Sequence, residues 1–179
     1  MEIPSSKHMV DLVYRCPMEK AIETSIEATK YAHDNGLEVV FFPIDFSRAE
    51  LKWALDLIER VGKDGHMDAL ALVDTFGVVS PHAMRYFVRE VQKRIKKRLE
   101  AHFHQDFGMG VANTILGVAA GIEVIHSTVL GIGEIGLKIT DLALGCKAAI
   151  EKIREQKATW SPLDGVQPKP GQLVSVTVS

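Results

Sequence analysis

The sequence predicts an α/β protein with parallel strands, and it favours a (β/α) barrel over an open sheet. Short apolar runs of strand length alternate with amphipathic helical stretches. Strict alternation of this kind indicates parallel strands joined by right-handed crossovers. Polar residues stand where the apolar runs end, which is the rim at which barrel enzymes place their chemistry. No GxGxxG turn follows a predicted strand, so a dinucleotide-binding sheet loses its main support.

The first helix and strand are marked by their end signals. Residues 17–35 place apolar side chains along one helical face, with Pro17 suited to the first turn and Gly36 to the residue just beyond the helix. The run LEVVFF at residues 37–42 has the length and composition of a strand buried on both faces. Residues 2–4 are a candidate strand fragment ahead of them.

A second helix and a second full strand follow. Ser47 and Glu50 form an S-x-x-E capping box, which predicts that a helix begins at this point. The run ALALV at residues 69–73 is the next buried strand. The expected inner stripe of the helix consists of Leu51, Ala54, Leu55, Ile58 and Val61.

The alternation continues through the rest of the chain. Ser80 and Pro81 supply an N-cap and a first-turn proline for a third helix. Its expected inner stripe is Met84, Phe87, Val88, Val91 and Ile95. Residues 99–104 and 122–130 are predicted strands, residues 109–120 a small-residue helix before Gly121, and residues 137–156 a last helix. We therefore predict one barrel-type domain over residues 1–156.

Residues 157–179 have a different character and are predicted to form a C-terminal tail. They include Trp160 and three prolines and end in the alternating sequence LVSVTVS. Either this tail is mobile or its last residues pair with a sheet edge.

The composition points away from nucleic acids and membranes. The 179-residue chain carries a formal net charge of -2, whereas binding to a phosphate backbone needs a concentrated excess of Lys and Arg. No window approaches the roughly 18 apolar residues that span a bilayer, and the first residues lack a signal-peptide pattern. Cys16 and Cys146 show neither disulfide nor metal-ligand spacing. We expect a cytoplasmic protein.

His102 and His104 are the candidate metal ligands. Residues two apart in a strand share a face, so the two imidazoles are expected to converge in the barrel mouth, while Ala101 and Phe103 face the helices. Neutral imidazole suits divalent ions, and an open catalytic site usually adds a carboxylate. Taken alone, an HxH pair more often marks hydrogen-bonded histidines than a metal site.

Longer motifs around these histidines carry a family resemblance. The run HFHQDFGMGVAN at residues 102–113 resembles the HxH(N/D)DxGxxxAN signature of the pyruvate carboxyltransferase and HMG-CoA lyase superfamily, which includes isopropylmalate, homocitrate and citramalate synthases. Residues 74–77 (DTFG) with Pro81 resemble its DTxGxxxP motif, and residues 131–134 resemble its GIGE loop. Residues 41–48 (FFPIDFSR) are similar to the FSPEDxxR strand of the synthases. The resemblance covers about residues 3–134.

The resemblance implies a metal-dependent enzyme that acts on a 2-oxo acid. His102 and His104 would bind a divalent ion, Mg, Mn or Zn, which chelates the carboxylate and keto oxygens of the substrate. Thr75 would hydrogen-bond the substrate carboxylate, with Asp74 and Arg48 beside it as further substrate-binding residues. Acetyl-CoA would be the second substrate.

The sequence also departs from the family at named positions. Ile44 stands where the synthases have a glutamate that serves their acid-base steps, and isoleucine cannot move a proton. Gln105 replaces an Asn or Asp, and residues 134–138 (EIGLK) lack the Arg and Asn of the family's GERAGN loop. Asp106 and Asn113 match, and the resemblance implies that they orient the ligand loop and the helix start.

By this comparison the chain begins at what would be the fourth strand of the barrel. We therefore expect a partial (β/α)8 TIM barrel, equivalent to about the last five strands, without the family's metal-binding Asp of the first strand. A closed barrel typically needs about 250 residues. Because a partial barrel leaves parallel edges open, we expect a homo-oligomer or another chain to cover them.

Three functions remain open from the sequence. The leading one is condensation of acetyl-CoA with a 2-oxo acid by an enzyme of the isopropylmalate or homocitrate synthase type. The second is cleavage by an HMG-CoA lyase- or aldolase-type enzyme, which does not demand the glutamate that Ile44 replaces. The third is a truncated barrel without turnover.

Overall fold

Six strands form one sheet whose spatial order follows the chain. The structure is a computed structural model that describes residues 1–128, 131 and 173–177. The first five strands are parallel, and the sixth is antiparallel to the fifth. The strands are β1 (Glu2–Pro4), β2 (Val40–Ile44), β3 (Ala69–Asp74), β4 (Arg98–Phe103), β5 (Val124–Thr128) and β6 (Leu173–Thr177).

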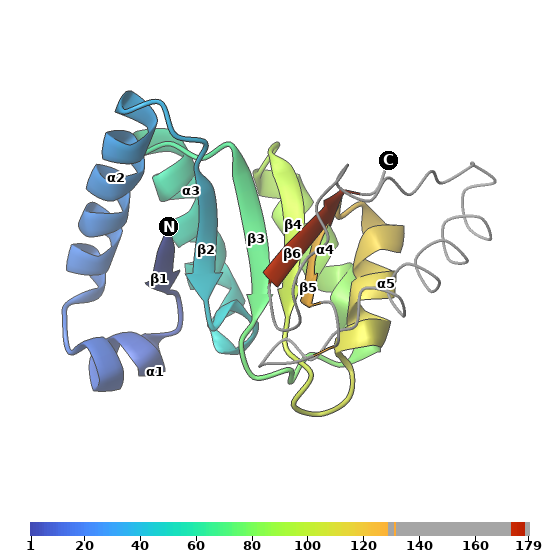
Figure 1. Cartoon of the computed structure of the whole chain (residues 1–179). Helices are drawn as coiled ribbons and strands as arrows, with labels where there is room; N and C mark the ends of the chain where they lie inside the picture. Colours follow the sequence, from blue (N-terminus) through green and yellow to red (C-terminus); the bar gives the residue numbers. More distant parts are fainter. Residues whose placement is uncertain (129–130, 132–172, 178–179) are drawn as a thin grey trace.

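The helices that connect the parallel strands lie on one side of the sheet (Figure 1). Each connection steps to the adjacent strand, and crossovers that share the usual right-handed sense bring every helix to the same face. Within the described residues, none of the helices is both long and apolar enough to cross a membrane. The elements are α1 (Lys7–Met9), the π-helical turn η1 (Val10–Tyr14), α2 (Met18–Asp34), the 3-10 turn η2 (Phe46–Arg48), α3 (Leu51–Asp64), α4 (Pro81–Arg94) and α5 (Gly110–Ala120).

This one-sided arrangement agrees with the predicted barrel and not with a doubly wound sheet, which carries helices on both faces. The core fills the space between the sheet and the helices. Alternate residues of β3 and β4, such as Leu70 and Phe103, pack there against Leu57, Val88 and Val118 of the helices. The opposite face of the sheet, called the inner face, carries the side chains of the other alternate residues of each strand.

Most predicted elements are present with shifted ends. Helix α2 matches the prediction, with Pro17 one position ahead of the first turn and Gly36 at φ +78°. Strand β2 begins at Val40, because the chain before it carries an exposed Leu37. Strand β5 begins at Val124 and not at the predicted residue 122, and the predicted end at residues 129–130 lies outside the described residues. The predicted helix at 137–156 lies outside the described residues, as does the boundary at 156.

The predicted capping box is wrong. Ser47 lies inside the turn η2, its hydroxyl has no hydrogen-bond partner among the described residues, and Glu50 occupies the N-cap position of α3 without a capping bond. The reason is the conformation of Asp45, which takes a left-handed φ of +62° and starts the extra turn. The helix therefore begins later than the local pattern indicates.

The end of the tail pairs with the sheet. The backbone of β6 runs antiparallel to β5, with Val124 opposite Thr177 and Thr128 opposite Leu173. Of the two alternatives for residues 173–177, edge pairing is therefore the one observed. It covers the free edge that β5 would otherwise present.

We expect the burial of the helix-side core to dominate stability, and two leucines allow a matched test. Leu57 on α3 is 2% exposed and Leu37 is 61% exposed. Leu57→Ala should lower the free energy of unfolding by about 2–5 kcal/mol through lost burial and the remaining cavity. Leu37→Ala should change it by less than about 0.5 kcal/mol. Urea unfolding followed by circular dichroism measures both, and equal losses would contradict this packing.

Candidate metal centre

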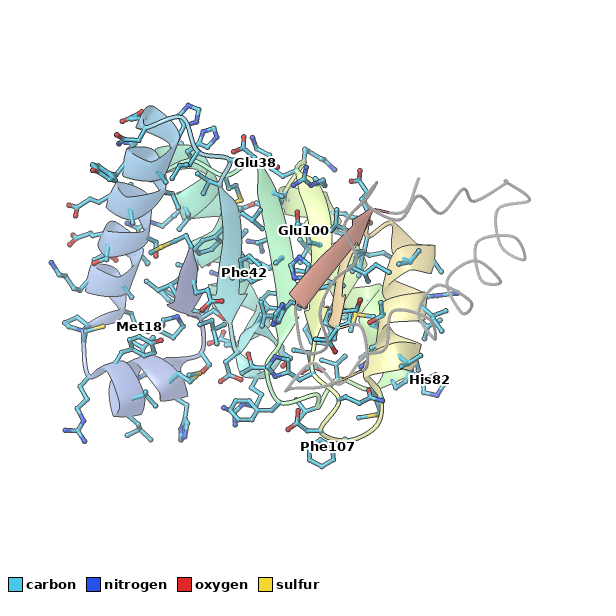
Figure 2. All side chains as sticks on the ribbon, in the orientation of Figure 1. Met18, Glu38, Phe42, His82, Glu100 and Phe107 are labelled. Atoms are coloured by element: carbon cyan, nitrogen blue, oxygen red, sulfur yellow. The ribbon has the colours of Figure 1, made fainter. Side chains whose placement is uncertain are left out.

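The carboxyl ends of the parallel strands bring polar side chains to one end of the sheet. Asp45 directly follows β2, Asp74 ends β3, His104 directly follows β4, and Ser127 lies near the end of β5. All four are buried. Figure 2 shows Phe107 at this end of the molecule and Glu38 at the opposite end. The predicted placement of polar residues at this rim is confirmed.

His102 and His104 lie together at this rim. His102 pairs with Val73 across the β3–β4 ladder, and its ring centroid is 5.3 Å from that of His104. Ala101 and Phe103 belong to the core on the helix side. The predicted alternation along β4 is therefore confirmed, with both imidazoles on the inner face.

Each imidazole has one nitrogen engaged within the protein. His104 donates from Nδ1 to the carbonyl oxygen of Thr75 at 2.6 Å, so its Nε2 carries the lone pair of a neutral ring. Nδ1 of His102 lies 3.0 Å from Nδ1 of His126. Neither Nε2 has a hydrogen-bond partner among the residues that the structure describes.

The surroundings of His102 favour its neutral form. Burial, and then the nearby His126 and His104, lower the pKa of His102 to about 4. Phe42 contacts its ring edge-on, with the centroids 5.7 Å apart. A neutral imidazole is the form that binds a metal ion.

The sequence did not predict a second set of polar side chains on the inner face, those of Glu100 and His126. Nε2 of His126 lies 3.0 Å from a carboxylate oxygen of Glu100, and both residues are 4% exposed. Arg98 donates to the other oxygen of Glu100 at 2.9 Å and to Glu38 at 2.7 Å. Burial opposes the charge of Glu100, but hydrogen bonds from His126 and Arg98 hold the pKa of its carboxyl below the usual value.

Asp74 shapes the loop that follows β3. Its two carboxylate oxygens accept hydrogen bonds from the backbone N–H groups of Val78 and Val79, at 3.1 Å and 3.0 Å. Its carbonyl oxygen accepts from the backbone N–H of His104 at 3.2 Å. Asp74 thus joins the loop to the strand that carries the histidines.

Thr75 and Gly77 complete this loop. The hydroxyl oxygen of Thr75 accepts from the backbone N–H of Asp45 at 2.8 Å, which leaves the hydroxyl proton free to donate. Gly77 has a φ of +60°, and a Cβ there would lie 2.9 Å from the carbonyl oxygen of His104. A larger residue would therefore push the loop away from the histidines.

Arg48 lies at the edge of the same rim. Its guanidinium donates to both oxygens of Asp45, at 2.7 Å and 2.8 Å, and stacks 3.9 Å from the ring centroid of Phe76. The Asp45 carboxylate also accepts from the hydroxyl of Ser6. The structure thus brings Arg48, Asp74 and Thr75 to the rim that holds the histidines, and their contact with a substrate stays a prediction.

Asn113 links α5 to the loop after β3. Its side-chain Nδ2 donates to the carbonyl oxygen of Val79 at 2.7 Å, and the residue is fully buried. Asp106 is exposed on the loop between β4 and α5. The expected role of Asn113 at the helix start is consistent with this contact.

The imidazoles of His102 and His104 are of a ligand type that divalent metal ions accept. Two imidazoles, each anchored through Nδ1, resemble the way metal-binding histidines are oriented by a second hydrogen bond. In the described ranges, no cluster of three or more His, Cys, Asp or Glu side chains is placed to hold an ion. His102 and His104 would therefore supply part of a site and not the whole of it.

The chain matches the HMGL-like family over residues 1–144. It is 36% identical over 118 residues to 2-isopropylmalate synthase of Methanocaldococcus jannaschii, which covers 66% of this chain and 23% of that protein. It is 38% identical over 116 residues to homocitrate synthase of Methanothermobacter thermautotrophicus, which covers 65% of this chain and 29% of that protein. The chain therefore spans less than a third of the length of these relatives.

Solved structures show the same fold. An HMG-CoA lyase from Acenitobacter baumannii, in complex with coenzyme A and 3-methylmalate, matches with a TM-score of 0.70 and 17% identity over 82% of this chain and 52% of that one. The hydroxymethylglutaryl-CoA lyase of Pseudomonas aeruginosa matches with a TM-score of 0.66 and 18% identity over 87% of this chain and 62% of that one. The five parallel strands and their helices therefore form part of a TIM barrel like that of the lyases.

The loop geometry predicts how substitutions at Asp74 act on stability. Asp74→Ala leaves two backbone N–H groups without acceptors, the one of Val79 being buried, and should lower the free energy of unfolding by about 1–3 kcal/mol. Asp74→Asn keeps one acceptor oxygen and should lose less. The exposed Asp106→Ala is the matched control, with an expected change below about 0.5 kcal/mol. Urea denaturation would refute the capping role if Asp74→Ala and Asp106→Ala were equally stable.

Proposed function

The chain belongs to the HMGL-like family, and on that premise we propose that it carries two metal-binding histidines of an enzyme that condenses acetyl-CoA with a 2-oxo acid. The proposed type is a synthase of the isopropylmalate, homocitrate or citramalate kind. The metal would be a divalent ion, with Mg, Mn and Zn as the candidates. The observation that carries the proposal is the pair His102 and His104, held side by side at the rim with both Nε2 atoms unpartnered among the described residues.

The residues of the rim would each have a defined part in binding. His102 and His104 would hold the metal ion, which when bound supplies Lewis acidity toward a keto oxygen. Thr75 would donate its free hydroxyl proton to the substrate carboxylate, since its oxygen already accepts from Asp45. Asp74 would keep the loop that carries Thr75 in place. Arg48, paired with both oxygens of Asp45 and stacked on Phe76, would lie at the edge of the substrate site.

Sequence similarity supports a synthase over a lyase. The two curated relatives named above are synthases at 36% and 38% identity. The lyases match at 17% and 18% identity, a level that supports the fold alone. The substrate of this chain within the 2-oxo acid class stays open in the proposal.

One feature favours cleavage as the second candidate. Ile44 ends β2 at the rim, and its partly buried apolar side chain stands at the position of the synthases' glutamate. A side chain of this kind cannot take up or release a proton. A lyase- or aldolase-type reaction that does not use this group is therefore the alternative, and a non-catalytic barrel fragment is the third possibility.

The proposal also includes an assembly and a location. Among the described strands, β1 pairs with β2 alone, so its outer edge is open to a second copy or another chain. Cys16 is a free thiol, as is usual in the reducing cytoplasm, where we place the protein.

Metal binding by the full chain tests the histidine assignment. Calorimetric titration with Zn²⁺ and Mn²⁺ should show one site, and His102→Ala or His104→Ala should weaken it by more than about 100-fold, beyond what changing a supporting residue costs. His82→Ala makes the same change at an exposed histidine on α4 (Figure 2) and should leave the affinity unchanged. A wild-type chain without metal affinity, or three variants that behave alike, would contradict the assignment.

A thiol-release assay tests the reaction itself. The metal-loaded chain, incubated with acetyl-CoA and pyruvate-type 2-oxo acids, should release free coenzyme A thiol, whereas His102→Ala should not. A thiol reagent followed by absorbance measures the release. If no 2-oxo acid yields thiol but a hydroxy acid is cleaved, the lyase alternative replaces the synthase. If neither reaction occurs, turnover by this chain alone is excluded.

A further inference from the structure

A buried chain of hydrogen bonds runs along the inner face behind His102. Nε2 of His126 lies 3.0 Å from Oε2 of Glu100, and Nδ1 of His126 lies 3.0 Å from Nδ1 of His102. The motifs shared with the family contain neither Glu100 nor His126. Both residues are 4% exposed, so water has little access to compete for the bond between them.

The hydrogen-bond partners assign each proton when the His126 ring is neutral. The carboxylate of Glu100 can only accept, so His126 donates to it from Nε2. A neutral His126 ring has one N–H group, so its Nδ1 is an acceptor. Nδ1 of His102 is then the donor that faces it. The lone pair of His102 then lies on Nε2.

The surroundings hold this arrangement in one orientation. Arg98 occupies the other carboxylate oxygen, Oε1, of Glu100 and so leaves Oε2 to His126. Phe42 stacks on the His126 ring at 5.5 Å and meets the His102 ring edge-on at 5.7 Å. In Figure 2, Phe42 and Glu100 lie over the middle of the sheet, between the two ends of the molecule.

We infer that Glu100 and His126 are positioning residues that hold His102 with its Nε2 lone pair free for a metal ion. The inference rests on the proposed function, in which His102 is a ligand. His104 reaches the same state by donating from Nδ1 to the Thr75 carbonyl. Both histidines thus present Nε2. The Thr75 carbonyl orients His104, and the Glu100 carboxylate orients His102 through the imidazole of His126.

The first test measures the proton positions directly on the metal-free wild-type chain. Long-range ¹H–¹⁵N correlation spectra distinguish the Nδ1–H from the Nε2–H form of each imidazole. His102 should carry its proton on Nδ1, the form that free histidine populates less. A proton on Nε2 of His102 would require protons on both nitrogens of His126 and would overturn the inference. The measurement needs no substitution and so does not depend on a variant that folds.

The second test compares variants of the hydrogen-bond chain. His126→Phe and Glu100→Leu remove one link each with apolar side chains of comparable size, and each should shift the His102 proton toward Nε2 and weaken Zn²⁺ binding by about 10–100-fold. Glu38→Gln removes the negative charge of another partner of Arg98 without changing the hydrogen bonds to His102, and it should change neither readout. Circular dichroism confirms that each variant is folded.

The outcomes separate this inference from the proposed function. Unchanged zinc affinity in folded His126→Phe and Glu100→Leu, with wild-type binding present, would overturn the positioning role. A wild-type chain with the Nδ1–H form of His102 but no affinity for Zn²⁺ or Mn²⁺ would refute the proposed function and leave the positioning of His102 supported.

Discussion

The register between β3 and β4 is the constraint on which the site depends. Six consecutive pairs, from Ala69 opposite Arg98 to Asp74 opposite Phe103, align the two strands. A slip of one residue would turn His102 to the helix side and Phe103 to the inner face. At the rim the loop after β3 secures this register, because the backbone and the ring of His104 bond to the carbonyls of Asp74 and Thr75. One loop therefore positions both strand β4 and the imidazole of His104.

Features that depend on local pattern were predictable from the sequence. Apolar runs and helical stripes located β3, α2 and α4, and the two-residue period of a strand placed His102 and His104 on one face. The S-x-x-E pattern was equally local, yet it failed because the left-handed Asp45, held by Arg48 and by Thr75, inserts a turn that no short motif encodes. Local rules give way where a distant contact sets the backbone.

Contacts between particular side chains on different strands were not predicted. The same alternation that pairs His102 with His104 also places Glu100 on the inner face, but its partner His126 lies on another strand. Only the adjacency of β4 and β5 joins them. The pairing of β6 with β5 has the same origin, because an alternating segment fits any open edge and the sequence does not say which one. The residues expected to bind substrate meet at the rim, each already fixed by a bond within the protein.

The antiparallel strand β6 also has a consequence for barrel closure. The outer edge of β5 offers one row of N–H and C=O groups, and β6 satisfies that row from Val124 to Thr128. A parallel strand that continued the barrel would need the same groups in a different, slanted pattern. The two partners are mutually exclusive, so ring closure at β5 would proceed by strand exchange, in which an incoming parallel strand displaces residues 173–177.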